Sequence, residues 1–260
     1  MRMAIGVEYD GSAFCGWQRQ KDQPSVQEAL ETALSRFADH TVEVVVAGRT
    51  DTGVHGLGQV AHFDSTAQRS EYAWLRGVNA FLPPPVSLRW VKPVADDFHA
   101  RFSATSRSYR YLICNLPQRP ALYRQCMTWI YAPLDAARMQ EAANHLLGRH
   151  DFSAFRASSC QAKHPVREIY QIVVQRQGDL VSIDIEANAF LHHMVRNIAG
   201  VLISVGSGKQ PVDWVQAVLV GRDRCQAGVT ALPSGLYLTR VRYPEHFAIP
   251  EPPGGVRLGG

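Results

Sequence analysis

The chain has 260 residues, of which 46% are hydrophobic and 19% are charged, and its 27 basic and 23 acidic side chains give a net charge of +4. This composition excludes an intrinsically disordered protein, which needs few hydrophobic residues and a high net charge. The length fits one large domain or two small ones, and either can bury a complete core.

Arginine supplies most of the positive charge, because four of the 27 basic residues are lysines and the other 23 are arginines. The planar guanidinium pairs with phosphate and stacks on bases, so this ratio favours a nucleic-acid partner. A coding preference for arginine explains the ratio equally well, and a net charge of +4 is weak evidence by itself.

The N-terminus, the apolar segments and the cysteines together predict a reduced, soluble, cytoplasmic protein with no membrane contact. Residues 1–5 run directly into a predicted strand and lack the apolar core and cleavage site of a signal peptide. Two histidines, an arginine and an asparagine interrupt the longest apolar stretch, 190–205, which excludes a bilayer span. The five cysteines include no CxxC pair, so we expect neither structural zinc nor a disulfide framework.

The first hundred residues predict the order strand, helix, strand, strand, helix, strand, which is that of a ferredoxin-like unit. Ser25 and Glu28 have the spacing of a capping box, and apolar residues recur behind them at helical intervals. Ser70 precedes a second helical pattern, which a run of three prolines ends. The predicted strands are 3–9, 41–47, 59–63 and 86–94, and the predicted helices are 26–37 and 70–81.

The second half repeats this order with one additional helix. Asp135 can cap a helix that Gly148 can end, and the turn at 177–178 is typical of a hairpin. The predicted strands are 106–114, 168–175, 179–187 and 236–243, and the predicted helices lie between 135 and 148, at 188–205 and at 212–220.

We therefore predict an α+β fold of two ferredoxin-like halves, each with a mainly antiparallel sheet and helices on one side. The faces without helices could form a central cleft. The predicted boundaries are 1–104 for the first half, 105–246 for the second and 247–260 for a flexible tail. RNA-recognition modules have this strand order, but many ferredoxin-like proteins bind no RNA.

Reactive side chains are concentrated in the loop at 47–56, between two predicted strands. Arg49, Asp51 and His55 place a guanidinium, a carboxylate and an imidazole among glycines, which permit close approach of a ligand. Rigid strands on both sides are typical of loops that carry reactive groups. A tight turn in which Asp51 bonds its own backbone explains the pattern equally well.

The triplet Asp-Thr-Gly at 51–53 also occurs in aspartic proteases. Those enzymes need two carboxylates that share a proton, and this chain has no second triplet of that kind. A homodimer could supply the second carboxylate, but the chain is far longer than proteases with one motif. Proteolysis is therefore a remote alternative, which an acid optimum for peptide cleavage would revive.

Two segments of the second half add polar groups in apolar surroundings. Tyr109, on its first strand, can stack on a base and move a proton, and core packing is the alternative. Arg196, in a predicted helix, needs an anionic partner if it is buried. His192 and His193 suggest a metal, but successive helical residues point in different directions and no cysteine or carboxylate completes the set. We therefore predict no metal site.

Several segments occur in the order and spacing of one enzyme family. They are YDGSAFCGWQ at 9–18, SVQE at 25–28, GRTDTGVH at 48–55, SRSYRY at 106–111 and FLHHMVRN at 190–197. Together they resemble the tRNA pseudouridine synthase A family over nearly the whole chain, from residue 3 to about 243. The fold of that family, two RNP-like halves around a deep cleft, agrees with the repeated pattern.

The resemblance implies an isomerase that converts uridine to pseudouridine at positions 38, 39 and 40 of the tRNA anticodon stem-loop. It also implies a homodimer and the use of no metal or organic cofactor. The residue that matches the family's nucleophile is Asp51, which would attack either uracil C6 or ribose C1′.

Further roles follow from the same resemblance. Tyr109 would stack on the target base and assist transfer of the C5 proton, and Arg196 would pair with Asp51 and keep it ionised. A non-catalytic RNA-binding module on the same two sheets is the second function class. The presence of all three residues argues against that class.

The remaining candidates would bind substrate. Arg49 would replace the target base as it leaves the stack. His55 is a candidate for which a hydrogen bond within its own loop is as good an explanation. Arg107 and Arg110 are candidate phosphate contacts, although packing of their stems on a strand face is simpler.

Overall fold

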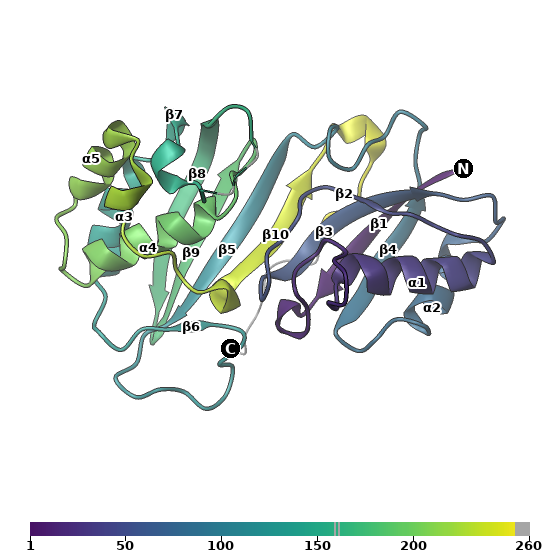
Figure 1. The fold of residues 1–260 in the computed structure, drawn as a ribbon, viewed down its shortest axis with the longest axis horizontal. Helices are drawn as coiled ribbons and strands as arrows, with labels where there is room; N and C mark the ends of the chain where they lie inside the picture. The colour runs from purple at the N-terminus through teal and green to yellow at the C-terminus, as the bar shows by residue number, and fades with distance from the viewer. Residues whose placement is uncertain (159, 161, 253–260) are drawn as a thin grey trace. The chain divides into compact units, whose positions relative to one another are not determined.

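The structure is a computed structural model that describes residues 1–158, 160 and 162–252. Contacts divide the chain into two compact units, one of Met1–Thr105 with the chain from Tyr237 onward, the other of Ser106–Leu236. Each unit combines helices with a mainly antiparallel set of strands (Figure 1). The predicted α+β fold class is therefore confirmed.

The first unit follows the predicted order, and its last strand comes from the end of the chain. β1 lies between β3 and β4 and pairs antiparallel with both, β2 pairs antiparallel with β3, and β10 runs parallel to β3. Its elements are β1 (Arg2–Tyr9), α1 (Val26–Ala38), β2 (Val45–Val46), β3 (His55–Asp64), α2 (Glu71–Asn79), β4 (Val86–Pro93) and β10 (Leu236–Arg242).

The two helices of this unit begin where the sequence predicts. The hydroxyl of Ser25 accepts a hydrogen bond from the Glu28 N–H, and the hydroxyl of Ser70 accepts one from the Ala73 N–H. Each cap satisfies a donor that the first helical turn leaves without a partner. The apolar faces of α1 and α2 share one core with the strands behind them (Figure 1).

In the second unit, strands β5, β9, β8 and β7 lie side by side in that order, each antiparallel to its neighbour, and β6 pairs parallel with β5. The Gln140 side chain joins α3 to β8, because it donates to the Ile172 carbonyl and accepts from the Val174 N–H. Its elements are β5 (Ser106–Cys114), β6 (Thr128–Trp129), α3 (Ala136–Asn144), β7 (Gly148–Asp151), β8 (Val166–Gln177), β9 (Leu180–Ala187), α4 (Met194–Gly206) and α5 (Trp214–Gly221).

Two predicted elements are shorter than expected. Of the strand predicted at 41–47, only β2 forms, because side chains of α1 accept hydrogen bonds from backbone N–H groups that would otherwise bond to a neighbouring strand. Ser35 accepts from the Val42 N–H at 2.8 Å, and Glu31 accepts from the Val44 N–H at 3.0 Å. The helix predicted at 188–205 begins at α4, because His193 has the left-handed φ of 62° that interrupts a helix.

The end of the chain contributes to the first unit. Sequence alone assigned residues 236–243 to the second half, but the Thr105 N–H donates to the Arg242 carbonyl and the Tyr243 hydroxyl donates to the Ala100 carbonyl. Of the predicted tail, residues 253–260 lie outside the described residues. Its first residue, Phe247, is buried against Phe98.

Within the part of the chain that the structure describes, every helix is too short or too polar to cross a bilayer.

Candidate active site

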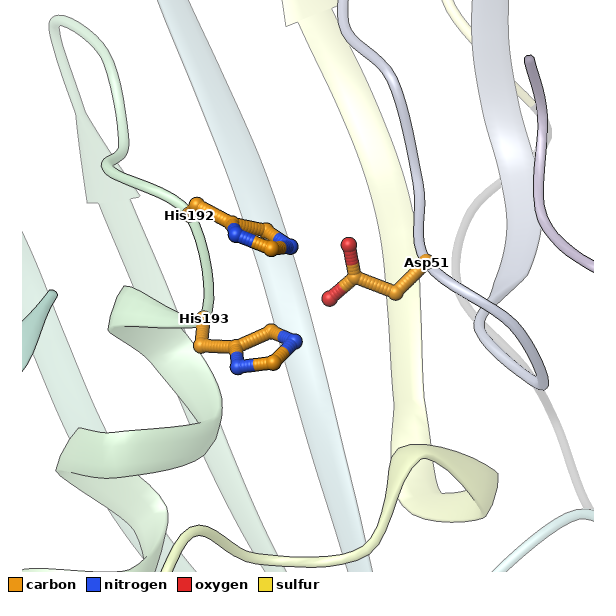
Figure 2. A group of neighbouring side chains, drawn as sticks. All are labelled: Asp51, His192 and His193. Carbon is orange, nitrogen blue, oxygen red and sulfur yellow. The ribbon is translucent and has the colours of Figure 1, made fainter. Parts of the chain in front are cut away.

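Asp51 lies in the first unit, in the loop that leads from β2 into β3 (Figure 2). Its side chain is half-buried, whereas Arg49 is exposed and the intervening Thr50 is buried. The loop therefore presents a cationic and an anionic side chain outward on either side of one residue that faces the interior.

The backbone of this loop is held on its inner side. The Trp17 N–H donates to the Thr50 carbonyl at 3.0 Å, and the Val54 N–H donates to the Asp51 carbonyl at 3.1 Å. The Gln59 amide, on β3, donates to a third loop carbonyl, that of Gly48, at 2.8 Å. These bonds fix the backbone beneath the carboxylate.

His55 is almost completely buried at the start of β3. Its Nδ1 accepts a hydrogen bond from the Gly11 N–H at 3.1 Å and lies 3.2 Å from the Asp10 carboxylate. A backbone N–H can only donate, so the lone pair of Nδ1 faces Gly11. The ring also stacks on Tyr237 with centroids 4.6 Å apart, so His55 has contacts that suit a structural role.

Tyr109 belongs to the second unit, where it lies on β5 opposite Ile185 of β9. It is 9% exposed and packs edge-on against Phe190, with ring centroids 5.0 Å apart. Tyr111 is completely buried, and its hydroxyl lies 2.6 Å from the Thr128 hydroxyl. Tyr111 therefore belongs to the core of its unit.

The two arginines of β5 are engaged within their own unit. Arg110 donates to the Asp184 carboxylate at 2.7 Å, directly across the strand pair, and both side chains are about one-third exposed. Arg107 donates to the Asn188 carbonyl at 3.1 Å. These bonds support the simpler explanation, in which both side chains stabilise the sheet.

Arg196 lies half-buried in the first turn of α4. Its Nε donates to the Ala231 carbonyl at 2.8 Å, and the Ala231 N–H donates back to the Arg196 carbonyl at 3.1 Å. The guanidinium therefore has one edge fixed by backbone, and its terminal nitrogens are oriented by that bond.

His192 and His193 lie in the segment between β9 and α4 (Figure 2). Their rings are in contact, with centroids 4.1 Å apart and planes inclined by 39°. The argument that successive helical residues diverge is therefore wrong for this pair, because neither residue is inside the helix. The geometry removes that argument against a metal ligand pair.

Comparison with known proteins decides the family. Residues 5–103 and 142–244 match the family model described as tRNA pseudouridine synthase. The chain belongs to the tRNA pseudouridine synthase family. Asp51 and Arg196 lie inside the matched segments, whereas Tyr109 lies between them. The family resemblance predicted from sequence motifs is confirmed, and the chain is an enzyme of the isomerase class.

Curated relatives carry the name tRNA pseudouridine synthase A. The relative from Paraburkholderia phytofirmans is 55% identical over 254 residues, which cover 98% of this chain and 94% of the relative. The relative from Pseudoalteromonas atlantica is 55% identical over 251 residues, which cover 96% and 95%. A chain in the crystal structure of a Cbf5-Nop10-Gar1 complex is 13% identical to this one, and the match covers 77% of this chain and 45% of that chain. Its TM-score of 0.38 is too low to indicate a shared fold.

Asn197 is a supporting residue of this tRNA pseudouridine synthase that the sequence motifs did not single out. Asn197 follows Arg196 and is completely buried. Its amide donates to the Phe155 carbonyl at 2.7 Å, and its oxygen accepts from Arg224 and Thr230 at 3.0 and 2.7 Å. An asparagine that follows an arginine in an apolar stretch is the signal that the sequence offered for this network.

Proposed function

We propose that this tRNA pseudouridine synthase isomerises uridine to pseudouridine at positions 38, 39 and 40 of the anticodon stem-loop, with Asp51 as its nucleophile. The observation that carries the proposal is the half-buried carboxylate of Asp51 on a loop whose backbone is fixed from the interior. A carboxylate can form a covalent adduct and then leave it, as this reaction requires.

The reaction exchanges one bond for another without a co-reactant. The glycosidic bond between N1 of uracil and C1′ of ribose breaks, the base turns, and a bond forms between C5 and C1′. The C5 proton leaves and N1 gains a proton, so the product is an isomer of the substrate. Asp51 would form its adduct at uracil C6 or at ribose C1′, and either route balances. Neither a metal nor an organic cofactor enters this proposal.

Three further residues complete the proposed machinery. Tyr109 stacks on the target base and assists removal of the C5 proton. Arg196 supplies the positive charge that pairs with the nucleophile, as the resemblance implies. Arg49, which is exposed, occupies the place of the base as it leaves the helical stack. The contacts of His55, Arg107 and Arg110 favour structural roles over the substrate-binding roles that the resemblance implies.

The test of the nucleophile is tritium release from tRNA that contains 5-tritiated uridine. Asp51→Asn removes the negative charge and keeps the shape of the side chain, so we expect no release while tRNA affinity stays within about tenfold. Asp97→Asn is the matched control, because it removes an exposed carboxylate elsewhere in the first unit. Turnover by Asp51→Asn at the rate of the control would refute the assignment.

The resemblance also implies a homodimer, and the cysteines and the N-terminus predict a cytoplasmic location; both statements are proposals. Equilibrium sedimentation of the purified protein tests the first, with twice the mass of one 28.9 kDa chain as the expected result. A single-chain mass across the range of assay concentrations would contradict it.

A further inference from the structure

A buried polar network lies beneath the loop that carries Asp51. Thr50 is buried, and its hydroxyl lies 2.7 Å from the hydroxyl of Tyr9, which ends β1. The Gln59 amide, which holds the Gly48 carbonyl, also donates to the Tyr9 hydroxyl at 3.4 Å. Two interior side chains therefore reach two positions of the loop.

The hydrogen-bonding groups of this network match one another. The amide nitrogen of Gln59 uses one hydrogen for each of its two bonds, and the amide oxygen accepts from the Val60 N–H at 3.2 Å. The Tyr9 and Thr50 hydroxyls share one hydrogen bond, in which either can donate, and the Tyr9 oxygen also accepts from Gln59. Burial raises the pKa of Tyr9 to about 12, so the phenol remains a donor near neutral pH.

Close packing restricts the network to one arrangement. A Cβ at Gly56 would lie 2.3 Å from the Tyr9 ring, so only glycine fits against that ring. Gly16 has a φ of +92°, and a Cβ there would lie 2.8 Å from the Thr50 carbonyl oxygen. Neither the phenol nor the loop can shift toward these glycines without moving backbone.

We propose that Tyr9, Thr50 and Gln59 are positioning residues, whose hydrogen bonds hold the backbone from which Arg49 and Asp51 project toward substrate. The proposal rests on the proposed function, because it assumes that Asp51 carries the chemistry. A reactive group displaced by about 1 Å can lose about 100-fold in rate. Loosening the network should therefore slow the chemical step and leave tRNA binding largely unchanged.

A double-mutant cycle on the single-turnover rate of tritium release tests the proposal. Tyr9→Phe removes the hydroxyl and keeps the ring, whereas Thr50→Val removes the partner hydroxyl and keeps the shape. We expect each variant to lose about tenfold or more in rate, with the dissociation constant for tRNA within about twofold. The double variant should be no slower than the slower single variant, because both changes remove one bond. Thr50→Ser, which keeps the hydroxyl, should retain most of the rate.

Ser65→Ala is the control for a variant that loses stability while the loop that carries Asp51 keeps its position. Ser65 is buried directly after the far end of β3, where its hydroxyl bonds His40 and the Ala67 N–H. Its removal should lower the unfolding midpoint and leave the single-turnover rate unchanged. If Asp51→Asn is inactive, two results would overturn the positioning role. The first is an unchanged rate in both single variants, and the second is a loss in the double variant equal to the product of the two single losses. An active Asp51→Asn would overturn the proposed nucleophile, and this proposal with it.

Discussion

Tyr109 belongs to the core of its unit, and its proposed role in the reaction depends on its hydroxyl. Its ring is fixed by Phe190, at 5.0 Å and nearly perpendicular, and 9% of the residue is exposed. Tyr109→Phe keeps the ring and loses the hydroxyl. If the phenol assists proton transfer, tritium release should slow by about 100-fold while tRNA affinity is unchanged, because general acid–base groups typically contribute about that much.

The control for that variant is Tyr170→Phe, which removes a hydroxyl from a half-exposed tyrosine on β8. Its rate of tritium release should match that of the unmodified enzyme. A Tyr109→Phe rate equal to that of the control would exclude the phenol from proton transfer and leave stacking as the only role of the ring.

Asn197 illustrates a residue whose contribution is to stability. Asn197→Ala removes three hydrogen bonds from the interior and leaves the Phe155 carbonyl and the Arg224 guanidinium short of a partner. Leaving a buried polar group without its partner costs about 1–3 kcal/mol. Urea denaturation should therefore show a free energy of unfolding that is lower by at least about 1 kcal/mol. Asn144→Ala, at an exposed residue of α3, should change the free energy of unfolding by less than about 0.5 kcal/mol.

The residues proposed to carry the chemistry were visible in the sequence, and the contacts that support them were not. Asp51 stands in a glycine-rich loop after an apolar strand, a pattern that indicates a reactive group. Thr50 stands beside Asp51 in the same motif and Gln59 in a predicted strand, but neither side chain is reactive by itself. Their importance arises only when β1 and β3 pair, because that pairing brings Tyr9 opposite Gly56 and within reach of both side chains.

At the scale of elements, periodicity and caps predicted the helices and long strands within a few residues. Ser25, Ser70 and Asp135 each form the predicted cap. Prediction failed where side chains replaced backbone partners, as at 41–44, and where one residue adopted a left-handed φ, as at His193. These events depend on tertiary contacts, which periodicity does not record.

The end of β3 and the segment after β4 share a histidine cluster that predicts acid sensitivity of the first unit. His62 is buried, its Nδ1 accepts from the Ala100 N–H, and its ring lies 4.9 Å from that of His99. Burial, with smaller contributions from Arg2 and His99, lowers the pKa of His62 to about 4, whereas the nearby Asp64 carboxylate opposes that shift.

A lowered histidine pKa means that the unfolded chain binds the proton more readily than the folded chain. The free energy of unfolding should therefore decrease as the pH falls from about 6.5 to about 4, and be insensitive to His62 above that window. Urea midpoints measured across this range test the expectation. His62→Gln should flatten the dependence, whereas the exposed His164→Gln should leave it unchanged; equal slopes for both variants would contradict the assignment.

The whole molecule has two compact units. Its net charge is only +4, although tRNA is a polyanion. If arginines contact tRNA phosphates, binding releases counterions and weakens with salt. We expect the affinity for tRNA to fall at least about tenfold between about 50 and 200 mM salt. Filter binding measures this directly, and a flat response would argue against phosphate contacts.

We propose that this enzyme forms pseudouridine in the anticodon arm through Asp51. Chemical mapping of pseudouridine, nucleotide by nucleotide, in unmodified tRNA incubated with the purified enzyme or with Asp51→Asn tests this proposal. We expect pseudouridine at positions 38, 39 or 40 with the unmodified enzyme and at none of them with the variant. Pseudouridine confined to other positions, or formed equally by Asp51→Asn, would contradict it.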